Sequence, residues 1–154
     1  MSDVTQSAAG AVTIDRATDA DAGAVAHLLG VLGYPLAVAD VPARLAALAT
    51  PNDALLLARD EAGVVLGLVG LHSFPSIHAS RANAYITALV TAPEARGRGV
   101  GRALVAAAEA WARARACGRL TVTSAEHRAD AHAFYPACAM PFTGRRFSKP
   151  LAAD

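Results

Sequence analysis

Several features that would point to a protein class are scarce in this 154-residue sequence. Neither charge is in excess, since 14 Lys and Arg stand against 13 Asp and Glu and leave a net charge of +1. No global field therefore favours nucleic acid or an anionic membrane as the partner. The two cysteines, Cys117 and Cys138, are far apart and form no Cys/His ligand pattern. This argues against a disulfide framework or structural zinc, and we expect no bound metal.

The sequence also shows no pattern typical of a signal peptide or of a membrane-spanning helix. Residues 1–10 have neither the positive n-region nor the apolar run of a signal peptide. Residues 22–39 are uncharged, but glycines, a histidine and Pro35 interrupt them, and a membrane helix needs about 20 predominantly apolar residues. We therefore expect a cytoplasmic protein with neither membrane nor nucleic acid as partner, either a monomer or a small oligomer such as a homodimer.

The sequence has enough apolar residues, 54%, to bury one hydrophobic core. Residues 1–11 are polar and small, and we expect them to form a loosely ordered tail before a single domain at 12–150. Hydrophobic periodicity predicts a first helix that Asp19 or Asp21 caps and Gly33 ends, and a long helix that begins at Val100 and has Gly118 as its C′ residue. Further helices are expected at 41–49 and 129–139, and strands at 12–16, 54–59, 64–71, 82–91, 120–123 and 143–149.

This order combines an antiparallel hairpin with a parallel crossover. It predicts an α/β (α+β) protein with a mixed, mostly antiparallel sheet of six to seven strands and helices on both faces.

The most informative stretch is a run of glycines and arginines at the junction between the fourth predicted strand and the long helix. A helix start supplies unpaired backbone N–H groups and the positive end of the helix dipole, and glycines allow a ligand to approach the backbone closely. The run lacks the Lys and Ser/Thr of a P-loop, and its spacing and position differ from those of a Rossmann fingerprint. It predicts a phosphate or pyrophosphate site, with solvated arginines on a plain loop as the alternative. Its members are Arg96, Gly97, Arg98, Gly99, Val100, Gly101 and Arg102.

Three motifs together resemble the GCN5-related N-acetyltransferase (GNAT) family. Arg96, Gly99 and Gly101 match its pyrophosphate motif, and residues 89–93, Leu-Val-Thr-Ala-Pro, are similar to the segment that precedes it. Residues 128–135, which end in Phe-Tyr, resemble its second cofactor motif. The resemblance covers essentially the whole chain. It departs from the family at 139–140, where Ala and Met replace Gly and an aromatic residue, and at 128, where Arg replaces a common Asn.

The resemblance implies a GNAT-like acyl-CoA N-acyltransferase fold and direct transfer of acetyl from acetyl-CoA, through a tetrahedral intermediate, to the amine of a small molecule or peptide. It implies that Tyr135 protonates the leaving thiolate, and that backbone at 89–91 holds the pantetheine arm and directs an N–H at the acetyl oxygen. The acceptor is expected between the corner at 33–35 and the loop at 72–81. The implied cofactor-binding residues are Leu89, Val90, Thr91, Arg96, Gly97, Arg98, Gly99, Val100, Gly101 and Arg102.

Two alternative functions remain possible, and the general base is not assigned. A non-catalytic acyl-CoA-binding or sensing module on the same fold would need the glycine-rich run but not Tyr135, and a binder of another phosphate ester would need the run alone. The general base is not assigned, because the strand at 82–91 contains no carboxylate. The candidates are His72, His78, Tyr85 and Glu126. We expect deprotonation through water ordered by backbone carbonyls and by His72 or Glu126, rather than by one dedicated carboxylate.

Overall fold

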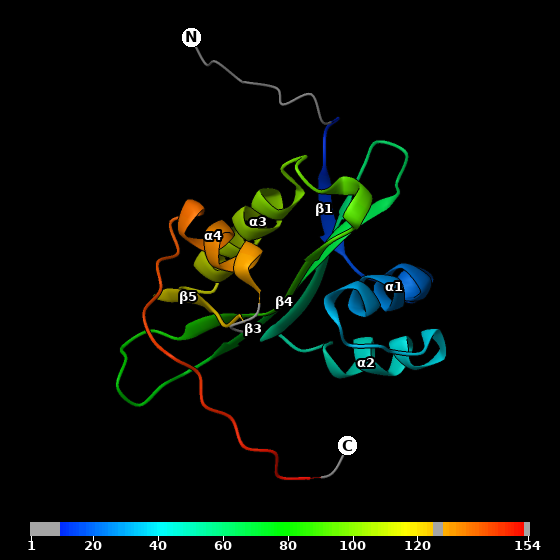
Figure 1. Cartoon of the computed structure of the whole chain (residues 1–154). Coiled ribbons are helices and arrows are strands. Elements are labelled where there is room, and N and C mark those ends of the chain that lie inside the picture. Colours follow the sequence, from blue (N-terminus) through cyan, green and yellow to red (C-terminus); the bar gives the residue numbers. More distant parts are fainter. Residues whose placement is uncertain (1–9, 125–127, 153–154) are drawn as a thin grey trace. The chain divides into compact units, whose positions relative to one another are not determined.

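The structure, a computed structural model, describes residues 10–124 and 128–152. The chain divides into two compact units, Met1–Val122 and Thr123–Asp154. Figure 1 shows the elements along the chain. The first unit contains β1 (Thr13–Arg16), η1 (Asp19–Asp21), α1 (Ala22–Leu32), η2 (Val38–Asp40), α2 (Val41–Ala47), β2 (Asp53–Arg59), β3 (Val65–Phe74), β4 (Asn83–Thr91), η3 (Pro93–Ala95), α3 (Val100–Ala114) and β5 (Arg119–Val122), and the second contains α4 (Ala129–Ala137).

The strands of the first unit form one mixed sheet in the order β1-β2-β3-β4-β5. Neighbouring strands are antiparallel except β4 and β5, which run parallel because α3 connects them as a crossover. The hairpin that the sequence predicts is formed by β2 and β3. Its turn is fixed by Asp60, whose Oδ1 accepts hydrogen bonds from the N–H groups of Ala62 and Val64, both at 2.9 Å. The expectation of a mixed, mostly antiparallel sheet is confirmed.

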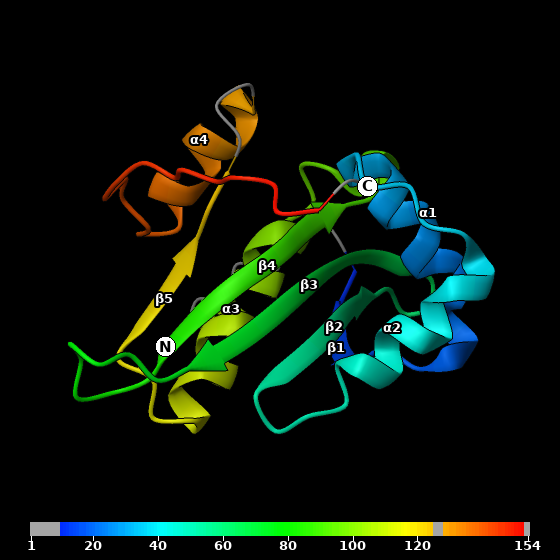
Figure 2. The same cartoon turned by 90° about the horizontal axis from the view of Figure 1, so that it is seen from below.

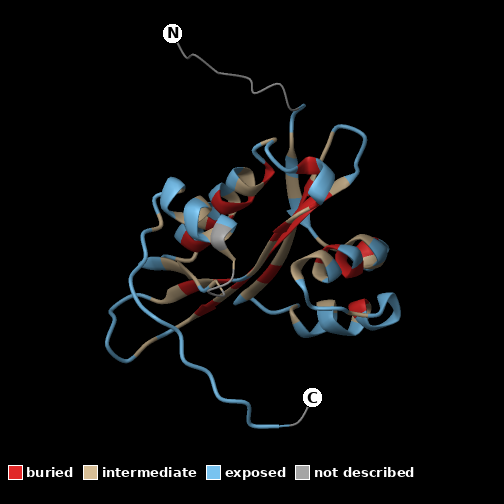
Figure 3. Cartoon of the chain, in the orientation of Figure 1, coloured by how far each residue is buried: buried red, intermediate tan, exposed pale blue. Residues whose placement is uncertain are grey.

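Helices cover both faces of this sheet, as the sequence predicts. Figures 1 and 2 show α3 on one face of β3 and β4, and α1 on the other. Gly67 on β3 permits the close approach of α3, since a Cβ there would lie 3.0 Å from the Leu104 side chain. Figure 3 shows the buried residues along the strands and on the sheet-facing sides of the helices. The largest fully buried side chains are Leu28, Val41, Leu57, Leu68, Val69, Leu71, Val100, Leu104 and Val105.

Two helices of the first unit, α1 and α3, end in left-handed residues. Gly33 ends α1 with φ 103°, as the sequence predicts. Ala116 takes the same position after α3 with φ 55°, and there the N–H of Cys117 donates to the carbonyl oxygen of Ala112 at 3.0 Å. This bond and the one from Ala116 N–H to Arg113 form a Schellman motif, in which an alanine has replaced the usual glycine.

The prediction that Gly118 is the C′ residue of α3 is wrong. Gly118 lies two residues beyond the left-handed position and leads into β5. A Cβ at Gly118 would lie 3.2 Å from Cβ of Arg81, so its missing side chain makes room for a neighbouring segment. The sequence pattern favoured glycine for the left-handed position because an alanine there costs about 1 to 2 kcal/mol.

The last predicted strand, at 143–149, does not form. These residues have no regular secondary structure and are exposed, and the ring of Phe147 is 90% exposed. Their alternation of polar and apolar residues provides one face, but a strand becomes stable only when a partner pairs with its backbone. Within the described residues the sheet therefore has five strands rather than six to seven.

The second unit is built around α4. This helix ends two residues before the predicted 139, and Ala139 is left-handed with φ 59°. The N–H of Met140 donates to the carbonyl oxygen of Tyr135 at 2.9 Å, which closes a second Schellman motif on an alanine. Cys117 in the first unit and Cys138 in the second are free thiols. No helix in the described parts of the chain is long and apolar enough to cross a membrane.

Candidate active site

The glycine-rich run forms the connection from β4 to α3 that the sequence predicts. After β4 the chain makes the short η3 turn and then passes through Gly97 and Gly99, whose φ values are 75° and 80°. Both angles lie in the left-handed region, which residues other than glycine rarely adopt. The two glycines therefore direct the backbone into α3, with Gly99 as N-cap and Val100 as first helical residue.

This turn presents backbone donors to open space. The opening bond of α3 runs from the N–H of Ala103 to the carbonyl oxygen of Gly99, at 3.0 Å. The N–H groups of Val100 and Gly101 precede it and have no acceptor within the helix. An added Cβ at Gly97 or Gly99 would meet no atom within 4 Å, and the first turn of α3 contains no acidic residue. Amides at the positive end of a 15-residue helix can thus bind an anion closely.

Three arginines accompany these amides. Arg96 and Arg102 are exposed, and Arg98 is half-buried. A guanidinium group offers several N–H donors in a planar fork that suits phosphate oxygens. Together with the amides they give this end of α3 a local positive field on a chain of almost zero net charge.

The second feature of the site is an open edge on β4. The parallel pairing with β5 reaches only from Asn83 to Ile86, because β5 ends at Val122. Figure 2 shows the two strands diverging beyond this point. Within the described residues, 87–91 therefore have a strand neighbour on the β3 side alone. We define 87–91 as the open edge of β4.

The backbone of the open edge alternates in the direction of its polar groups. The N–H of Ala92 donates to the carbonyl oxygen of Leu66 on β3, at 2.8 Å. Successive residues of a strand turn their backbone groups to opposite sides, so the groups of Val90 also face β3. Those of Leu89 and Thr91 face the open edge. An extended ligand can pair with them as an added strand would.

A β-bulge lies at the start of the open edge. Gly70 of β3 is paired with Ala88 and Leu71 with Ile86, so Thr87 is an extra residue in β4. The Thr87 hydroxyl lies over Gly70, where an added Cβ would be 2.5 Å from its Oγ1. Bulges bend a strand and interrupt its ladder, which here re-aims the backbone at one end of the open edge.

Tyr135 lies in α4, in the second unit. Its ring makes an edge contact with Phe134 at 5.3 Å between centroids. Burial raises the pKa of the Tyr135 phenol above its usual value. The group is therefore protonated at neutral pH, which is the state that a proton donor needs.

The base candidates differ in their surroundings. His72 on β3 lies with Nδ1 2.8 Å from Oδ1 of Asp53 on β2. His78 is exposed and contacts the Ser76 hydroxyl at 2.8 Å, and Tyr85 lies on β4. The fourth candidate, Glu126, lies outside the described residues. Sequence reasoning missed Asp53, because 19 residues separate it from His72 and only the β2–β3 register brings the two together.

No group of three or more metal-ligating side chains is found among the described residues. The polar groups that this region of the first unit offers include backbone amides, arginines and the His72–Asp53 pair. That inventory suits the binding of a phosphorylated, extended ligand and the transfer of a proton.

A mixed sheet with a glycine-rich turn at a helix start and an open strand edge beside it is the arrangement that the resemblance to acyl-CoA N-acyltransferases implies. Residues 22–140 match the model of the acetyltransferase (GNAT) family. The match spans 119 of 154 residues, counted from 22 to 140, and includes parts of both units. The chain belongs to the GNAT acetyltransferase family. It is an N-acetyltransferase that uses acetyl-CoA, and the family resemblance of the sequence is confirmed.

Individual relatives support this assignment. The chain is 34% identical over 149 residues to an aminoglycoside N(6')-acetyltransferase type 1 of Stenotrophomonas maltophilia, covering 93% of this chain and 96% of that protein. The crystal structure of a transcriptional regulator from Bacillus halodurans has a TM-score of 0.82 and 28% identity, covering 92% of this chain and 100% of the other. An aminoglycoside 6'-N-acetyltransferase from Acinetobacter baumannii has a TM-score of 0.77 at 19% identity, with the same coverage, and shows the shared fold.

Proposed function

We propose that the chain transfers acetyl from acetyl-CoA to the 6'-amino group of an aminoglycoside. The observation behind this proposal is the 34% identity, over almost the full length of both proteins, to an aminoglycoside N(6')-acetyltransferase. Aminoglycosides carry several amines, which are mostly protonated near neutral pH. A chain with almost no net charge does not repel such a cation at long range. The acceptor enters between the corner at 33–35 and the loop at 72–81.

Acetyl-CoA binds along the open edge of β4 and at the start of α3 in this proposal. The diphosphate is held by amides of residues 97–102 and by Arg96, Arg98 and Arg102. The pantetheine arm pairs with the outward backbone groups of Leu89 and Thr91, with Val90 holding the strand between them to β3. An amide of this edge donates to the acetyl oxygen, where negative charge develops during attack. The open amides at Gly97 to Gly101 and the unpaired edge support this placement.

Tyr135 is the acid that protonates the departing thiolate. The motif match around residues 128–135 and the raised pKa of its phenol support this role. The role also requires residues 12–150 to act as one catalytic domain, and the family match across both units supports that requirement. We expect Tyr135→Phe to lower kcat about 10- to 10³-fold and to leave the KM for acetyl-CoA nearly unchanged, since a proton donor acts only in the transition state. Phe134→Leu serves as the packing control. If Tyr135→Phe stays within about twofold of wild type, the tyrosine is structural.

The acceptor is tested with a pair of aminoglycosides that differ only in having an amino or a hydroxyl group at position 6'. Release of free CoA measures turnover, and mass spectrometry locates the acetyl group. We expect turnover of the 6'-amino compound alone, with acetyl on that nitrogen. Acetylation of both compounds would contradict the regiochemistry. Binding of acetyl-CoA without turnover of any amine would favour the non-catalytic acyl-CoA-binding module instead.

A further inference from the structure

A row of polar and aromatic side chains crosses three strands of the sheet. Asp53 on β2 is paired in register with His72 on β3, and His72 with Tyr85 on β4. The His72 ring stacks on Phe74 at 5.6 Å, and Phe74 contacts the Tyr85 ring at 5.5 Å. The row is therefore a connected cluster whose rings support one another, and it ends on the strand with the open edge.

The contacts of Asp53 fix the orientation and the tautomer of His72. One oxygen of Asp53 accepts a hydrogen bond from the Thr50 hydroxyl, and the other lies 2.8 Å from Nδ1 of His72. These hydrogen bonds, the one from Thr50 first, lower the pKa of Asp53 against the effect of burial, so the carboxylate is ionised near neutral pH. An ionised carboxylate only accepts hydrogen bonds, so Nδ1 of His72 carries a proton. In the neutral ring Nε2 then presents a lone pair.

The cluster lies on the sheet face opposite α3. Gly67 faces α3, and side chains of a strand alternate between faces, so His72 and Phe74 point to the other face. The His72 side chain is 44% exposed there, which leaves the ring accessible. Its neighbour Tyr85 precedes the Thr87 bulge by two residues, a distance of about 7 Å along a strand. That is the end of the open edge farther from the start of α3, toward which an acyl chain bound at the start of α3 extends.

We propose that His72 is the general base that deprotonates the acceptor amine, and that Asp53 is the residue that positions it. Nε2 takes one proton from the ammonium group, and the freed nitrogen lone pair forms the C–N bond at the acetyl carbon. The C–S bond breaks and its electron pair leaves with sulfur. The nitrogen loses its second proton and the thiolate gains one, so that the thiol forms and the proton on His72 is released to water. The proposal replaces the expected transfer through ordered water with direct transfer of the proton to His72, which Asp53 orients.

The titratable groups beside His72 on the flanking strands are Asp53 and Tyr85. The test therefore compares His72→Ala, Asp53→Asn and Asp53→Glu with wild type. His27→Ala, which removes an exposed histidine from α1, is the control. For each protein we measure kcat/KM for the 6'-amino aminoglycoside against pH, the binding of acetyl-CoA by calorimetry and the thermal midpoint. Imidazole added to His72→Ala tests chemical rescue.

We expect His72→Ala to lose about 10²- to 10⁴-fold in kcat/KM, the usual contribution of a general base, with unchanged acetyl-CoA binding and partial recovery in imidazole. The limb of the pH profile that reports His72 protonation disappears in this variant. Asp53→Asn also loses rate, by up to about 10⁴-fold, because the amide no longer requires a proton on Nδ1, and Asp53→Glu recovers part of the loss. A His72→Ala protein that folds, binds acetyl-CoA and keeps its rate within about twofold would overturn the inference.

The inference rests on the proposed function, and the measurements separate the two. Wild-type protein that binds acetyl-CoA but acetylates no amine removes the proposed function and this inference with it. If the wild-type protein acetylates the amine and His72→Ala keeps the same turnover, the inference about His72 fails and the proposed function stands. If His72→Ala does not fold, Asp53→Asn decides by its pH profile and by the ¹⁵N spectrum of the His72 ring, in which we expect the proton on Nδ1 in wild type only.

Discussion

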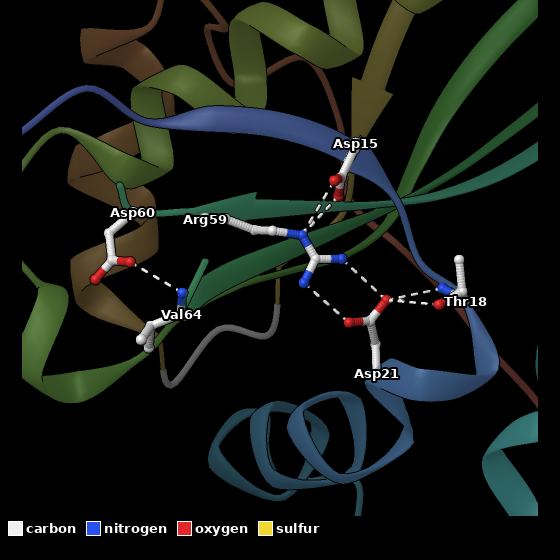
Figure 4. Close-up of polar contacts among 6 residues, drawn as sticks. All are labelled: Asp15, Thr18, Asp21, Arg59, Asp60 and Val64. Atoms are coloured by element: carbon white, nitrogen blue, oxygen red, sulfur yellow. Dashed lines mark hydrogen bonds and ion pairs between the residues drawn. The ribbon is translucent and has the colours of Figure 1, made fainter. Parts of the chain in front are cut away.

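Two regions of the first unit use polar groups in opposite ways. Around Arg59 charged side chains bind one another in a network, as Figure 4 shows. Its guanidinium donates two hydrogen bonds of 2.9 Å to Asp21 and contacts Asp15 at 2.9 and 3.1 Å. Asp21 in turn accepts the Thr18 N–H at 2.8 Å. This network fixes the start of α1 to β2 and leaves little for a ligand to bind.

The β4–α3 junction has the reverse character. Its amides at Val100 and Gly101 have no intrahelical acceptor, and its glycines have open space beside them. Among the residues that the structure describes, no strand faces the outward groups of Leu89. The two regions differ in whether their donors and acceptors are already hydrogen-bonded within the protein. A structural cluster of charges has its hydrogen bonds made, whereas a ligand site keeps donors that a ligand can still bind. A site for a diphosphate and an extended arm needs donors that folding has left unpaired.

The largest effect is expected from removing the centre of the Arg59 network. Arg59→Met should lower the free energy of unfolding by about 2 to 4 kcal/mol, because it leaves the nearly buried Asp21 carboxylate without its partner. Acetyl-CoA affinity should stay within about twofold. Chemical denaturation and calorimetry measure the two quantities. Asp15→Asn, which removes a partner that is 55% exposed, is the matched control and should cost less than about 1 kcal/mol.

The same network gives a pH dependence with a defined sign. Hydrogen bonds from Arg59 hold the pKa of Asp21 below its usual value, against the opposing effect of burial. The ion pair therefore stabilises the folded protein fully above about pH 4, the ordinary value for Asp, and this contribution is lost as pH falls through the lowered pKa. The stability difference between wild type and Arg59→Met should shrink as the pH falls below 4. A constant difference would contradict the assignment.

A smaller effect, on binding rather than stability, is expected at the open junction. Gly99→Asp places a negative charge beside the amides and should weaken acetyl-CoA binding about 10- to 100-fold, which corresponds to about 1.4 to 2.8 kcal/mol. Gly99→Asn is the matched control, since it has the same size and asparagine tolerates a positive φ. Calorimetry should show a loss at least about threefold smaller for Asn. Wild-type affinity in Gly99→Asp would remove the junction as the diphosphate site.

The smallest effect is expected at the end of α3, which belongs to neither region. Ala116→Gly should raise the free energy of unfolding by about 0.5 kcal/mol, because relief of the left-handed alanine outweighs the extra chain entropy of glycine. Ala114→Gly, at the last helical residue, should instead lower it by up to about 1 kcal/mol. Changes of opposite sign in the free energy of unfolding of these two variants confirm the Schellman assignment. Changes of the same sign contradict it.

The sequence was sufficient wherever local chemistry decides the structure. The hairpin around Asp60, the helix end at Gly33 and the turn into α3 all follow from short-range patterns, and the motif residues predicted the family. Glu109 and Arg113, which lie four residues apart on α3, also form an ion pair, at 3.3 Å. Two predictions were wrong. Gly118 was predicted to end α3, but Ala116 takes the left-handed position. The strand predicted at 143–149 does not form, because no strand pairs with its backbone among the described residues.

What could not be predicted depends on register between distant segments. Asp53 meets His72, and Arg59 meets Asp21, only after the strands have paired. The open edge of β4 likewise results from where β5 ends, at Val122, and no residue of β4 itself encodes that. Pairing between distant segments therefore determines which polar groups form hydrogen bonds within the protein and which remain available to a ligand.

The central claim is that acetyl-CoA occupies the open edge of β4 and the start of α3. Amide hydrogen exchange followed residue by residue by NMR, with and without saturating acetyl-CoA, tests it directly on this 15.7 kDa chain. We predict slower exchange at Leu89, at Thr91 and at the amides of 97–102 when acetyl-CoA is bound, with Arg59 and Asp21 unchanged. Bound acetyl-CoA that leaves exchange at these amides as fast as in the free protein, and slows it elsewhere, would contradict the account.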